Sequence, residues 1–311
     1  MSGQESMRIF FRIVGVACLF LFVGLSFHVL DLQSLFMQMR SLLHRPILLA
    51  LLVGLYGASF LLKTYAWRLY LHEKITLREG LYGLLYSLLV NHLSPLKIGD
   101  AVRIAAVTKR GRVSWAEAAQ SVIVMRLLDL LILGLFGAFG TLLLFQQLSV
   151  RVLLFVLGSV LMLIIALFLR HKAPSFLQKQ LQQLSSALQG GRGAAIVLLV
   201  AVSWIFEAFV IFGISSNVSF WEAVWVNSVT IAGQVFQLTP GGVGTYETVM
   251  TFALRAVGVP VQKAYEWALL SHGFKFLFSY GAGLLVFLIY PIQLASYLRY
   301  KKKGETNEWR K

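Results

Sequence analysis

Long apolar runs separated by short polar segments make up most of the chain. A helix needs about 20 apolar residues to cross the hydrocarbon core of a bilayer, so each long run predicts one membrane span. The pattern therefore predicts an all-α integral membrane protein, with residues 1–311 forming one polytopic domain. About six runs meet the required length, namely Ile13–Leu30, Pro46–Trp67, Trp115–Phe145, Arg151–Leu169, Gly193–Ile214 and Val261–Tyr290.

Two shorter apolar stretches, Leu77–Val90 and Ser219–Leu238, run into proline and glycine before a full span is complete. The first leads into NHLSPLKIGD and the second into TPGGVGTYE. A backbone break at membrane depth is tolerated only where it is buried in protein or lines a cavity. We therefore predict two re-entrant helical hairpins with Pro95 and Pro240 at their tips. The alternative is a pair of ordinary helices that end at the surface in turn-rich loops.

The two predicted tips share one pattern, SPLKIG in the first and TPGGVG in the second, with proline and glycine at identical spacing. Equivalent elements that enter the membrane from opposite sides indicate an inverted repeat, and interrupted segments in corresponding positions are typical of a transporter's binding site. We expect the halves of the repeat at roughly 46–145 and 193–290. The polar cavity should lie between the two tips.

The composition narrows the class of protein. Hydrophobic residues make up 58% of the chain, charged residues only 13%, and the mean hydropathy is +0.75. A soluble domain usually carries about 25% charged residues, and a disordered chain combines low hydrophobicity with high charge, so both classes are excluded. The single cysteine, Cys18, allows no intramolecular disulfide and no cysteine metal cluster.

The chain has 28 Lys and Arg against 13 Asp and Glu, a formal charge of +15. With a cytoplasmic N-terminus and two re-entrant hairpins, most of the 28, Lys63 and Arg103 among them, fall in cytoplasmic segments. The outside segments hold only Arg40, Arg45, Arg151, Arg255 and Lys263, and the membrane elements hold Lys97, Arg126 and Lys275. This bias follows the positive-inside rule, so we expect both termini to be cytoplasmic and expect no nucleic-acid partner. Residues 170–192 read as a basic amphipathic linker on the anionic inner leaflet.

Arg126 lies in the middle of a predicted span, where a cation is unfavourable by about 2.5–3.5 kcal/mol and usually faces a cavity or a partner. Asp129 follows three residues later on the same helical face. The two side chains form either an internal ion pair or a phosphate anchor in which Asp129 orients the guanidinium, whose fork binds two phosphate oxygens. Lys275 is a second candidate, although a lysine can also snorkel to the interface.

Gly99 and Gly244 each precede a predicted helix start, where free backbone N–H groups and the helix dipole favour an anion. Gly241 and Gly242 would let the backbone approach a lipid headgroup closely, or they form a plain flexible turn. We therefore count these glycines among the candidate headgroup-binding residues.

Several charged residues have more than one interpretation. Asp100 and Glu247 lie just past the two tips and act either as N-terminal helix caps or as groups that bind a proton or a headgroup amine. Glu207, in the middle of a span, is a candidate for the same coupling role, or it is simply protonated by burial. Arg103 is expected at the cytoplasmic mouth, where it is solvated or contacts a lipid phosphate.

The sequence offers little for other chemistry. There is no HExxH or comparable ligand spacing, so His92 and His272 are expected to be single hydrogen-bonding histidines and no metal is expected. No GxxxxGK[ST] motif supports coupling to ATP. No nucleophile–base arrangement is visible, and no cofactor is expected.

Together these motifs resemble the flippase-like integral membrane family of the lysylphosphatidylglycerol synthase transmembrane region. The residues that carry the resemblance are Asn91, Pro95, Gly99, Asp100 and Arg103 in NHLSPLKIGDAVR, Arg126 and Asp129 in RLLD, and Pro240, Gly241, Gly242, Gly244 and Glu247 in TPGGVGTYE. The chain departs from the family pattern at Met125, where an acid is expected beside the arginine. A carboxylate–arginine contact at that point is therefore not expected from the sequence.

The resemblance implies a protein of the cytoplasmic membrane that moves a phosphate-containing lipid, such as an aminoacylated phosphatidylglycerol or a prenyl phosphate, across the bilayer. In the full-length synthases a soluble domain charges the lipid from aminoacyl-tRNA. That domain is not expected here, because the chain ends at Lys311 after the last span. The alternatives are the membrane subunit of a lipid-modifying enzyme, such as a phosphatidylglycerol lysyltransferase, and a scaffold without transport. A homo-oligomer or a separate synthase are the protein partners that would fit.

Overall fold

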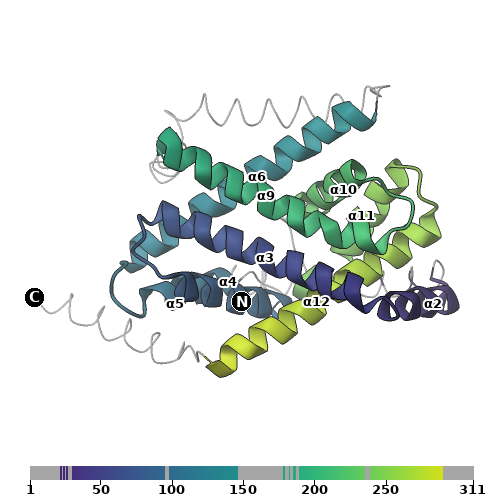
Figure 1. Cartoon of the computed structure of the whole chain (residues 1–311), viewed down its shortest axis with the longest axis horizontal. Helices are drawn as coiled ribbons and strands as arrows, with labels where there is room; N and C mark the ends of the chain where they lie inside the picture. Colours follow the sequence, from purple (N-terminus) through teal and green to yellow (C-terminus); the bar gives the residue numbers. More distant parts are fainter. Residues whose placement is uncertain are drawn as a thin grey trace, which may run out of the picture.

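The computed structural model describes residues 30–94, 98–145, 189–234 and 239–289, together with Phe22, Gly24, Ser26, Gln178, Gln182, Ser185 and Ser186. These residues form helices and no strand, which confirms the all-α prediction (Figure 1). The helices are α2 (Leu32–Leu43), α3 (Pro46–Tyr70), α4 (Leu77–Leu93), α5 (Gly99–Thr108), α6 (Trp115–Leu144), α9 (Gly190–Ile214), α10 (Phe220–Gly233), the 3-10 helix η3 (Pro240–Gly242), α11 (Thr245–Ala256) and α12 (Val261–Ile289).

Four of these helices, α3, α6, α9 and α12, are long and apolar enough to cross a membrane. They correspond to four of the predicted spans, so the chain is a multi-pass membrane protein. The predicted spans Ile13–Leu30 and Arg151–Leu169 lie almost wholly outside the described residues, as does most of the predicted linker. Its residues 190–192 belong to α9.

The helix α2 was not predicted, because a search for runs of about 20 apolar residues passes over a 12-residue amphipathic segment. It begins at Asp31, whose carboxylate accepts hydrogen bonds from the backbone N–H groups of Gln33 and Ser34 at 2.9 and 3.2 Å. Such a side-chain cap satisfies N–H groups that have no partner within the helix. The helix is exposed and lies beside α3 (Figure 1).

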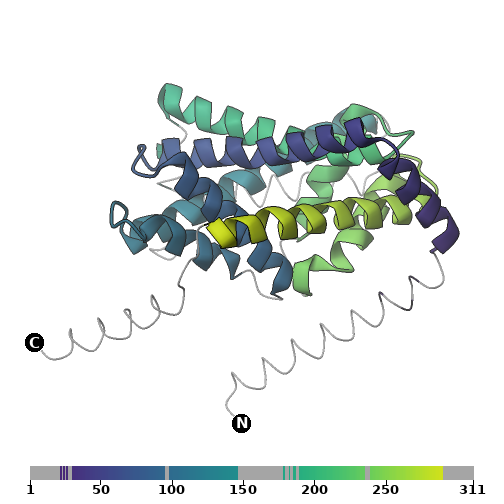
Figure 2. The same ribbon diagram turned by 60° about the horizontal axis from the view of Figure 1, so that its bottom comes forward.

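The helices α3 and α9 lie side by side and antiparallel (Figures 1 and 2). Near the end of α3, Trp67 is fully buried in one cluster with Ile196 and Val200, which come from the first half of α9. Near the start of α3, Leu52 packs against Gly213 at the end of α9. An antiparallel pair is what two halves of opposite orientation require.

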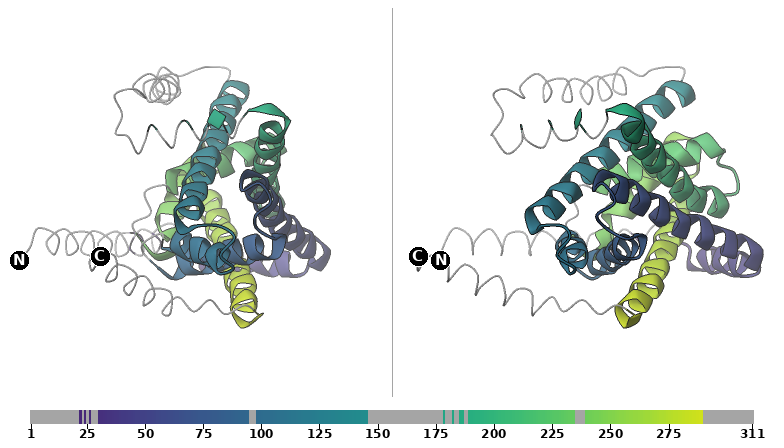
Figure 3. Two further views of the ribbon diagram at one scale, coloured as in Figure 1. Left: turned by 90° about the vertical axis from the view of Figure 1, so that its left-hand side faces the viewer. Right: turned by 60° about the vertical axis from the view of Figure 1, so that its left-hand side comes forward.

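The remaining helices pack in a reciprocal pattern around this pair (Figure 3). In the first half, α4 lies against α3 and its partner α5 lies against α6. In the second half, α10 lies against α9 and α11 lies against α12. In addition, α4 packs on α12 and α10 packs on α6, so each half contributes its long helix to the hairpin of the other. The repeat of 46–145 and 193–290 and its inversion in a membrane stay predictions.

A glycine allows each of these crossed contacts. A Cβ on Gly140 of α6 would lie 2.6 Å from the Cδ1 atom of Trp225 on α10, and a Cβ on Gly283 of α12 would lie 2.5 Å from the Cβ of Leu89 on α4. Real Cβ atoms do not approach so closely, so the two helix pairs can only reach this distance where the side chain is absent. The same device occurs once in each half.

The two predicted hairpins are present as pairs of short helices, α4–α5 and α10–α11, each with a break between its members. The helices α5, α10 and α11 have 10, 14 and 12 residues, which is too short to cross a bilayer. The helix α4 has 17 residues, the lower limit for a span. The helix–break–helix arrangement is therefore confirmed, and the depth of the hairpins in a membrane stays a prediction.

Candidate functional site

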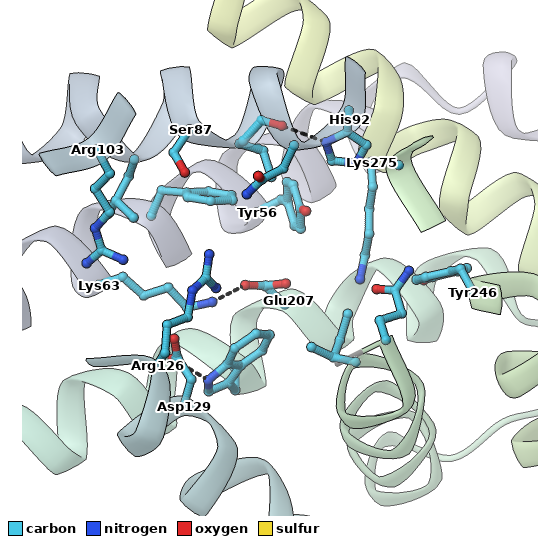
Figure 4. A pocket seen from close by; sticks show the side chains of 18 of the residues that line it. Tyr56, Lys63, Ser87, His92, Arg103, Arg126, Asp129, Glu207, Tyr246 and Lys275 are labelled. Carbon is cyan, nitrogen blue, oxygen red and sulfur yellow. Dashed lines mark hydrogen bonds and ion pairs between the residues drawn. The ribbon is translucent and has the colours of Figure 1, made fainter. Parts of the chain in front are cut away.

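A cavity of about 190 Å³ is lined by residues of α3, α4, α5, α6, α9, α10, η3, α11 and α12. Its wall carries four cations, Lys63, Arg103, Arg126 and Lys275, but only two carboxylates, Asp129 and Glu207. Figure 4 shows these side chains converging from separate helices on one space. The excess of cations makes the cavity suited to an anion.

The structure brings together seven of the predicted site residues. They are Asn91, Arg103, Arg126, Asp129, Glu207, Gly241 and Lys275. Six other predicted residues do not line the cavity, namely Gly99, Asp100, Pro240, Gly242, Gly244 and Glu247. Pro95 lies outside the described residues.

Arg126 pairs with Asp100 of α5, whose Oδ1 lies 2.9 Å from its Nη2. The predicted pair with Asp129 is wrong, because the Asp129 carboxylate accepts a hydrogen bond from Trp204 Nε1 at 2.9 Å. Met125 occupies the position where the family pattern has an acid, and the carboxylate that meets the arginine comes from another helix. The Arg126 side chain is 45% exposed, so its guanidinium remains available to a ligand in the cavity.

Lys63 reaches into the cavity from α3 and pairs with Glu207 of α9 at 2.5 Å. Its ammonium also lies 3.3 Å from the centre of the Trp204 ring, a cation–π contact. Lys63 was not predicted as a site residue, and the structure places it in the cavity. The predicted span Pro46–Trp67 already contains Lys63, and this signal could have placed it in the membrane.

Lys275 of α12 is 4% exposed and does not snorkel to the surface. Its Nζ donates a hydrogen bond to Asn227 Oδ1 on α10 at 3.3 Å and lies 5.2 Å from the centre of the Tyr246 ring. A neutral amide and an aromatic face leave its positive charge without a carboxylate partner.

Arg103 is the most confined of the four cations. It is 3% exposed, and its guanidinium carbon lies 4.0 Å from the centre of the Trp67 ring. The Nε atom is buried without a hydrogen-bond partner, and among the described residues no carboxylate pairs with Arg103. Of the two alternatives for Arg103, solvation is wrong and contact with a lipid phosphate stays a prediction, since the guanidinium points into the cavity (Figure 4).

The first tip is held by a side chain of its own hairpin. The backbone N–H of Gly99, at the start of α5, donates a hydrogen bond to Asn91 Oδ1 at 2.9 Å. This N–H is therefore not free to bind an anion, contrary to the prediction. Glycine is required here by close packing, because a Cβ would lie 2.2 Å from the carbonyl oxygen of Ser87.

The second tip is built from glycines in left-handed backbone conformations. Gly241, Gly242 and Gly244 have φ values of 63°, 77° and 85°, which other residues rarely adopt. The N–H of Gly244 donates a hydrogen bond to Glu247 Oε2 at 2.7 Å, so Glu247 has the predicted capping contact and Gly244 does not present a free N–H. Of the three glycines, only Gly241 lines the cavity.

His272 was not predicted as a site residue, and it joins this tip to α12. Its Nδ1 lies 2.6 Å from Glu247 Oε1, and its Nε2 lies 3.1 Å from the carbonyl oxygen of Gly241. The ring also stacks on Tyr246 with a centroid distance of 4.2 Å. No sequence signal links Glu247 to His272, because they lie 25 residues apart on separate helices. Within the described part of the chain, no group of three His, Cys, Asp or Glu residues is arranged to hold a metal.

The fold and the cavity define a multi-pass helical membrane protein with a cation-lined interior. The family model for the lysylphosphatidylglycerol synthase TM region matches residues 11–283. The chain belongs to this family of flippase-like membrane proteins, which confirms the resemblance. Comparisons with curated proteins and with solved structures returned no match.

Proposed function

We propose that the protein translocates a phosphate-containing lipid across the cytoplasmic membrane. The headgroup would enter the cation-lined cavity while the acyl or prenyl chains remain in the bilayer. An aminoacylated phosphatidylglycerol and a prenyl phosphate are both lipids of the required kind.

The observation that carries the proposal is the unpaired guanidinium of Arg103. Leaving a buried charge without a partner is strongly unfavourable, so such a group normally has a ligand. Arg103 is 3% exposed, has a buried Nε with no hydrogen-bond partner, and lines the cavity. A phosphate is the fitting ligand, because a guanidinium donates two parallel hydrogen bonds to two of its oxygens.

The other cations support the same ligand. Arg126 and Lys63 each have a carboxylate partner, whereas Lys275 has only a neutral amide. Arg126 is the cation whose charge acts on Arg103, whereas Lys275 stands on the opposite side of the cavity (Figure 4). Arg126, already neutralised by Asp100, would contribute less to phosphate binding than Arg103.

The size of the cavity supports entry of a headgroup alone. Sites that enclose a drug-sized ligand have volumes of roughly 300–1,000 Å³. The cavity here has about 190 Å³, which accommodates a small phosphate-bearing group and not the lipid chains. Translocation with the chains left in the bilayer is the mode of transport consistent with this volume.

Reconstitution into liposomes of phosphatidylcholine and phosphatidylglycerol, with a fluorescent phosphatidylglycerol and dithionite quenching, measures the movement directly. We expect Arg103→Ala to slow translocation about tenfold or more, since a hydrogen bond to a charged group contributes roughly 1.5–3 kcal/mol. Arg126→Ala should have a smaller effect. Arg255→Ala is the matched control, because Arg255 is exposed on α11 and does not line the cavity.

A fluorescent glucosylceramide, whose headgroup has no phosphate, should not be moved above the rate in protein-free liposomes. The proposal fails if wild-type protein moves phosphatidylglycerol no faster than protein-free liposomes do. An unchanged rate in Arg103→Ala would remove the proposed phosphate site.

The proposal includes an orientation with both termini in the cytoplasm. The bias of basic residues towards the predicted cytoplasmic segments supports it, even after Lys63 and Arg103 are moved to the cavity. Cys18 is the single cysteine, so a Cys18→Ser background with one cysteine added at position 305 tests the C-terminus. In whole cells this cysteine should resist a membrane-impermeant maleimide until the cells are lysed.

A further inference from the structure

Two buried titratable groups meet at the second tip and take no part in the contacts proposed for the phosphate, although one of them, His272, also lines the cavity. Glu247 of α11 and His272 of α12 are each 3% exposed. Both oxygens of the Glu247 carboxylate are engaged, one by the N–H of Gly244 and one by His272. Both nitrogens of the His272 ring are engaged as well, by Glu247 and by the carbonyl of Gly241.

If both contacts of the His272 ring are hydrogen bonds, they fix the number of protons. A carbonyl oxygen only accepts hydrogen bonds, so His272 Nε2 must carry a proton to bond to Gly241. The 2.6 Å contact between His272 Nδ1 and Glu247 Oε1 then needs a second proton, on either the imidazole or the carboxyl group. Without it, a lone pair of the ring would face a carboxylate. The arrangement therefore holds one proton more than a neutral histidine beside an ionised glutamate.

Loss of this proton breaks one of the two contacts. If the remaining ring proton moves to Nδ1 to keep the bond to Glu247, the lone pair on Nε2 faces the carbonyl of Gly241 and repels it. If the proton stays on Nε2, the contact with Glu247 is lost instead. Proton occupancy is thus linked to the position of the second tip.

A movement of the second tip would change the cavity, because Gly241 of this tip forms part of the cavity wall. Gly241 lines the cavity and lies between two helices, since a Cβ built there would lie 2.3 Å from the Phe276 ring of α12 and 3.3 Å from the carbonyl oxygen of His92 on α4. Releasing the carbonyl of Gly241 would therefore change the wall between the two hairpins.

Other titratable groups surround the pair, and their charges act on it. The ring centre of His92 on α4 lies 6.5 Å from that of His272, and Tyr246 of α11 stacks on His272. On α12, Tyr265 precedes His272 in the chain and Lys275 follows it. His92 directs Nδ1 at the carbonyl of Leu88 at 2.8 Å, so it is hydrogen-bonded within its own helix.

We propose that Glu247 and His272 form a proton-binding site whose occupancy holds or releases the second tip, so that lipid translocation is coupled to proton uptake and release. The proposal rests on the translocation proposed above. It deepens it by naming the coupling ion and the residues that bind it. No covalent chemistry is involved: one proton binds from solution and later returns to it.

Two measurements on the same proteoliposomes test the coupling. The first is the rate of lipid translocation at equal internal and external pH, in steps from about pH 5 to pH 8, where a histidine changes its charge. The second is proton movement, reported by pyranine trapped inside. We expect the wild-type rate to change by up to about tenfold per pH unit on one limb of the profile, as a one-proton step requires, and we expect lipid movement to be accompanied by proton flux.

Glu247→Gln should give a rate that does not depend on pH and should carry no lipid-dependent proton flux. His272→Gln should also flatten the profile. The matched control is Glu222→Gln, which makes the same carboxylate-to-amide change at an exposed helix cap on α10, where glutamine still accepts from the backbone. This variant should keep the wild-type pH profile.

The outcomes separate the two proposals. If wild-type protein moves lipid at a rate independent of pH and without proton flux, the proton site is refuted while translocation stands. If Glu247→Gln keeps the wild-type profile, the assignment to Glu247 is refuted. If no lipid moves, translocation fails, and infrared difference spectra between about pH 5 and pH 8 still test the site. A carboxyl or carboxylate band lost in Glu247→Gln would support it, and spectra identical to wild type would refute it.

Discussion

The hairpins α4–α5 and α10–α11 both begin with a capping box, but different side chains hold their tips. A capping box formed by Thr76 and Glu79 starts α4, and one formed by Ser219 and Glu222 starts α10. At the first tip the N–H of Gly99 is bound by the amide oxygen of Asn91. At the second tip the N–H of Gly244 is bound by the carboxylate of Glu247.

The two hairpins share a backbone arrangement but differ in the side chain that holds the tip. The amide of Asn91 does not titrate, so this contact does not depend on a proton. The same hairpin supplies Arg103 to the cavity, and its Asp100 pairs with Arg126. The carboxylate of the second tip is joined to His272, and in the proposal above this is the tip that binds and releases a proton. A symmetric backbone can therefore carry an asymmetric function, because the contacts at the tips are made by side chains that the repeat does not share.

The largest expected loss of stability comes from placing an alanine at the glycine of each tip, and it should differ between the two tips. In Gly99→Ala the new Cβ would lie 2.2 Å from a backbone oxygen of α4, so we expect a loss of about 3 kcal/mol, the upper part of the range for overpacking. In Gly244→Ala the nearest atom is 3.3 Å away and the φ of 85° is the main obstacle, at about 1–2 kcal/mol. Unfolding by sodium dodecyl sulfate in mixed micelles measures both.

Gly244→Asn is the control for the second tip, since asparagine adopts left-handed conformations more readily than alanine. It should be more stable than Gly244→Ala. Equal losses in Gly99→Ala and Gly244→Ala would contradict the view that the first tip is limited by close approach and the second by backbone conformation.

A second pair of variants tests whether the halves are equivalent in their crossed contacts. Gly140→Ala and Gly283→Ala should each lose about 2 kcal/mol, because both place a Cβ within 2.6 Å of the opposite hairpin. Gly134→Ala in α6 and Gly281→Ala in α12 are matched controls with no atom within 4 Å. These controls should gain up to about 1 kcal/mol from helix propensity. Losses differing by more than about 1 kcal/mol between the two test variants would show that the halves are not equivalent there.

The smallest effect concerns the feature that the hairpins share. Thr76→Ala and Ser219→Ala each remove a side-chain cap, which contributes about 1 kcal/mol. Similar losses in the same micelle titration are expected, and the Thr76 loss should be slightly larger because its cap is partly buried while that of Ser219 is exposed. A neutral result at one site alone would mean that the capping boxes stabilise the two hairpins differently.

Much of the fold could be predicted because it depends on local sequence. The length of an apolar run decides whether a helix can span a bilayer, and this rule identified α3, α6, α9 and α12. Proline and glycine in SPLKIG and TPGGVG marked the breaks in the hairpins. The helix α2 was missed because its signal is an N-terminal cap followed by an amphipathic turn pattern, not a long apolar run.

The sequence predicted which charged residues belong to the candidate site, but it did not predict which residue each of them pairs with. Arg126 and Lys275 stood out because charges are rare within apolar runs, and both line the cavity. The pairs Arg126–Asp100, Lys63–Glu207 and His272–Glu247 could not be predicted, since their members lie on different helices.

By itself the sequence determined that the chain is a helical membrane protein with two interrupted hairpins and a few intramembrane charges. Apolar length, charge bias and proline–glycine breaks act along the chain, so they can be read from it without a fold. Only the tertiary structure decided which of the charges has a carboxylate partner and which does not. The packing of α3, α5, α6 and α9 pairs Lys63 and Arg126 with acids and leaves Arg103 stacked on Trp67, with no carboxylate partner among the described residues. The packing of α11 on α12 brings Glu247 to His272. Partnership between charges depends on distances of a few ångströms between helices, and such distances are set by how the helices pack.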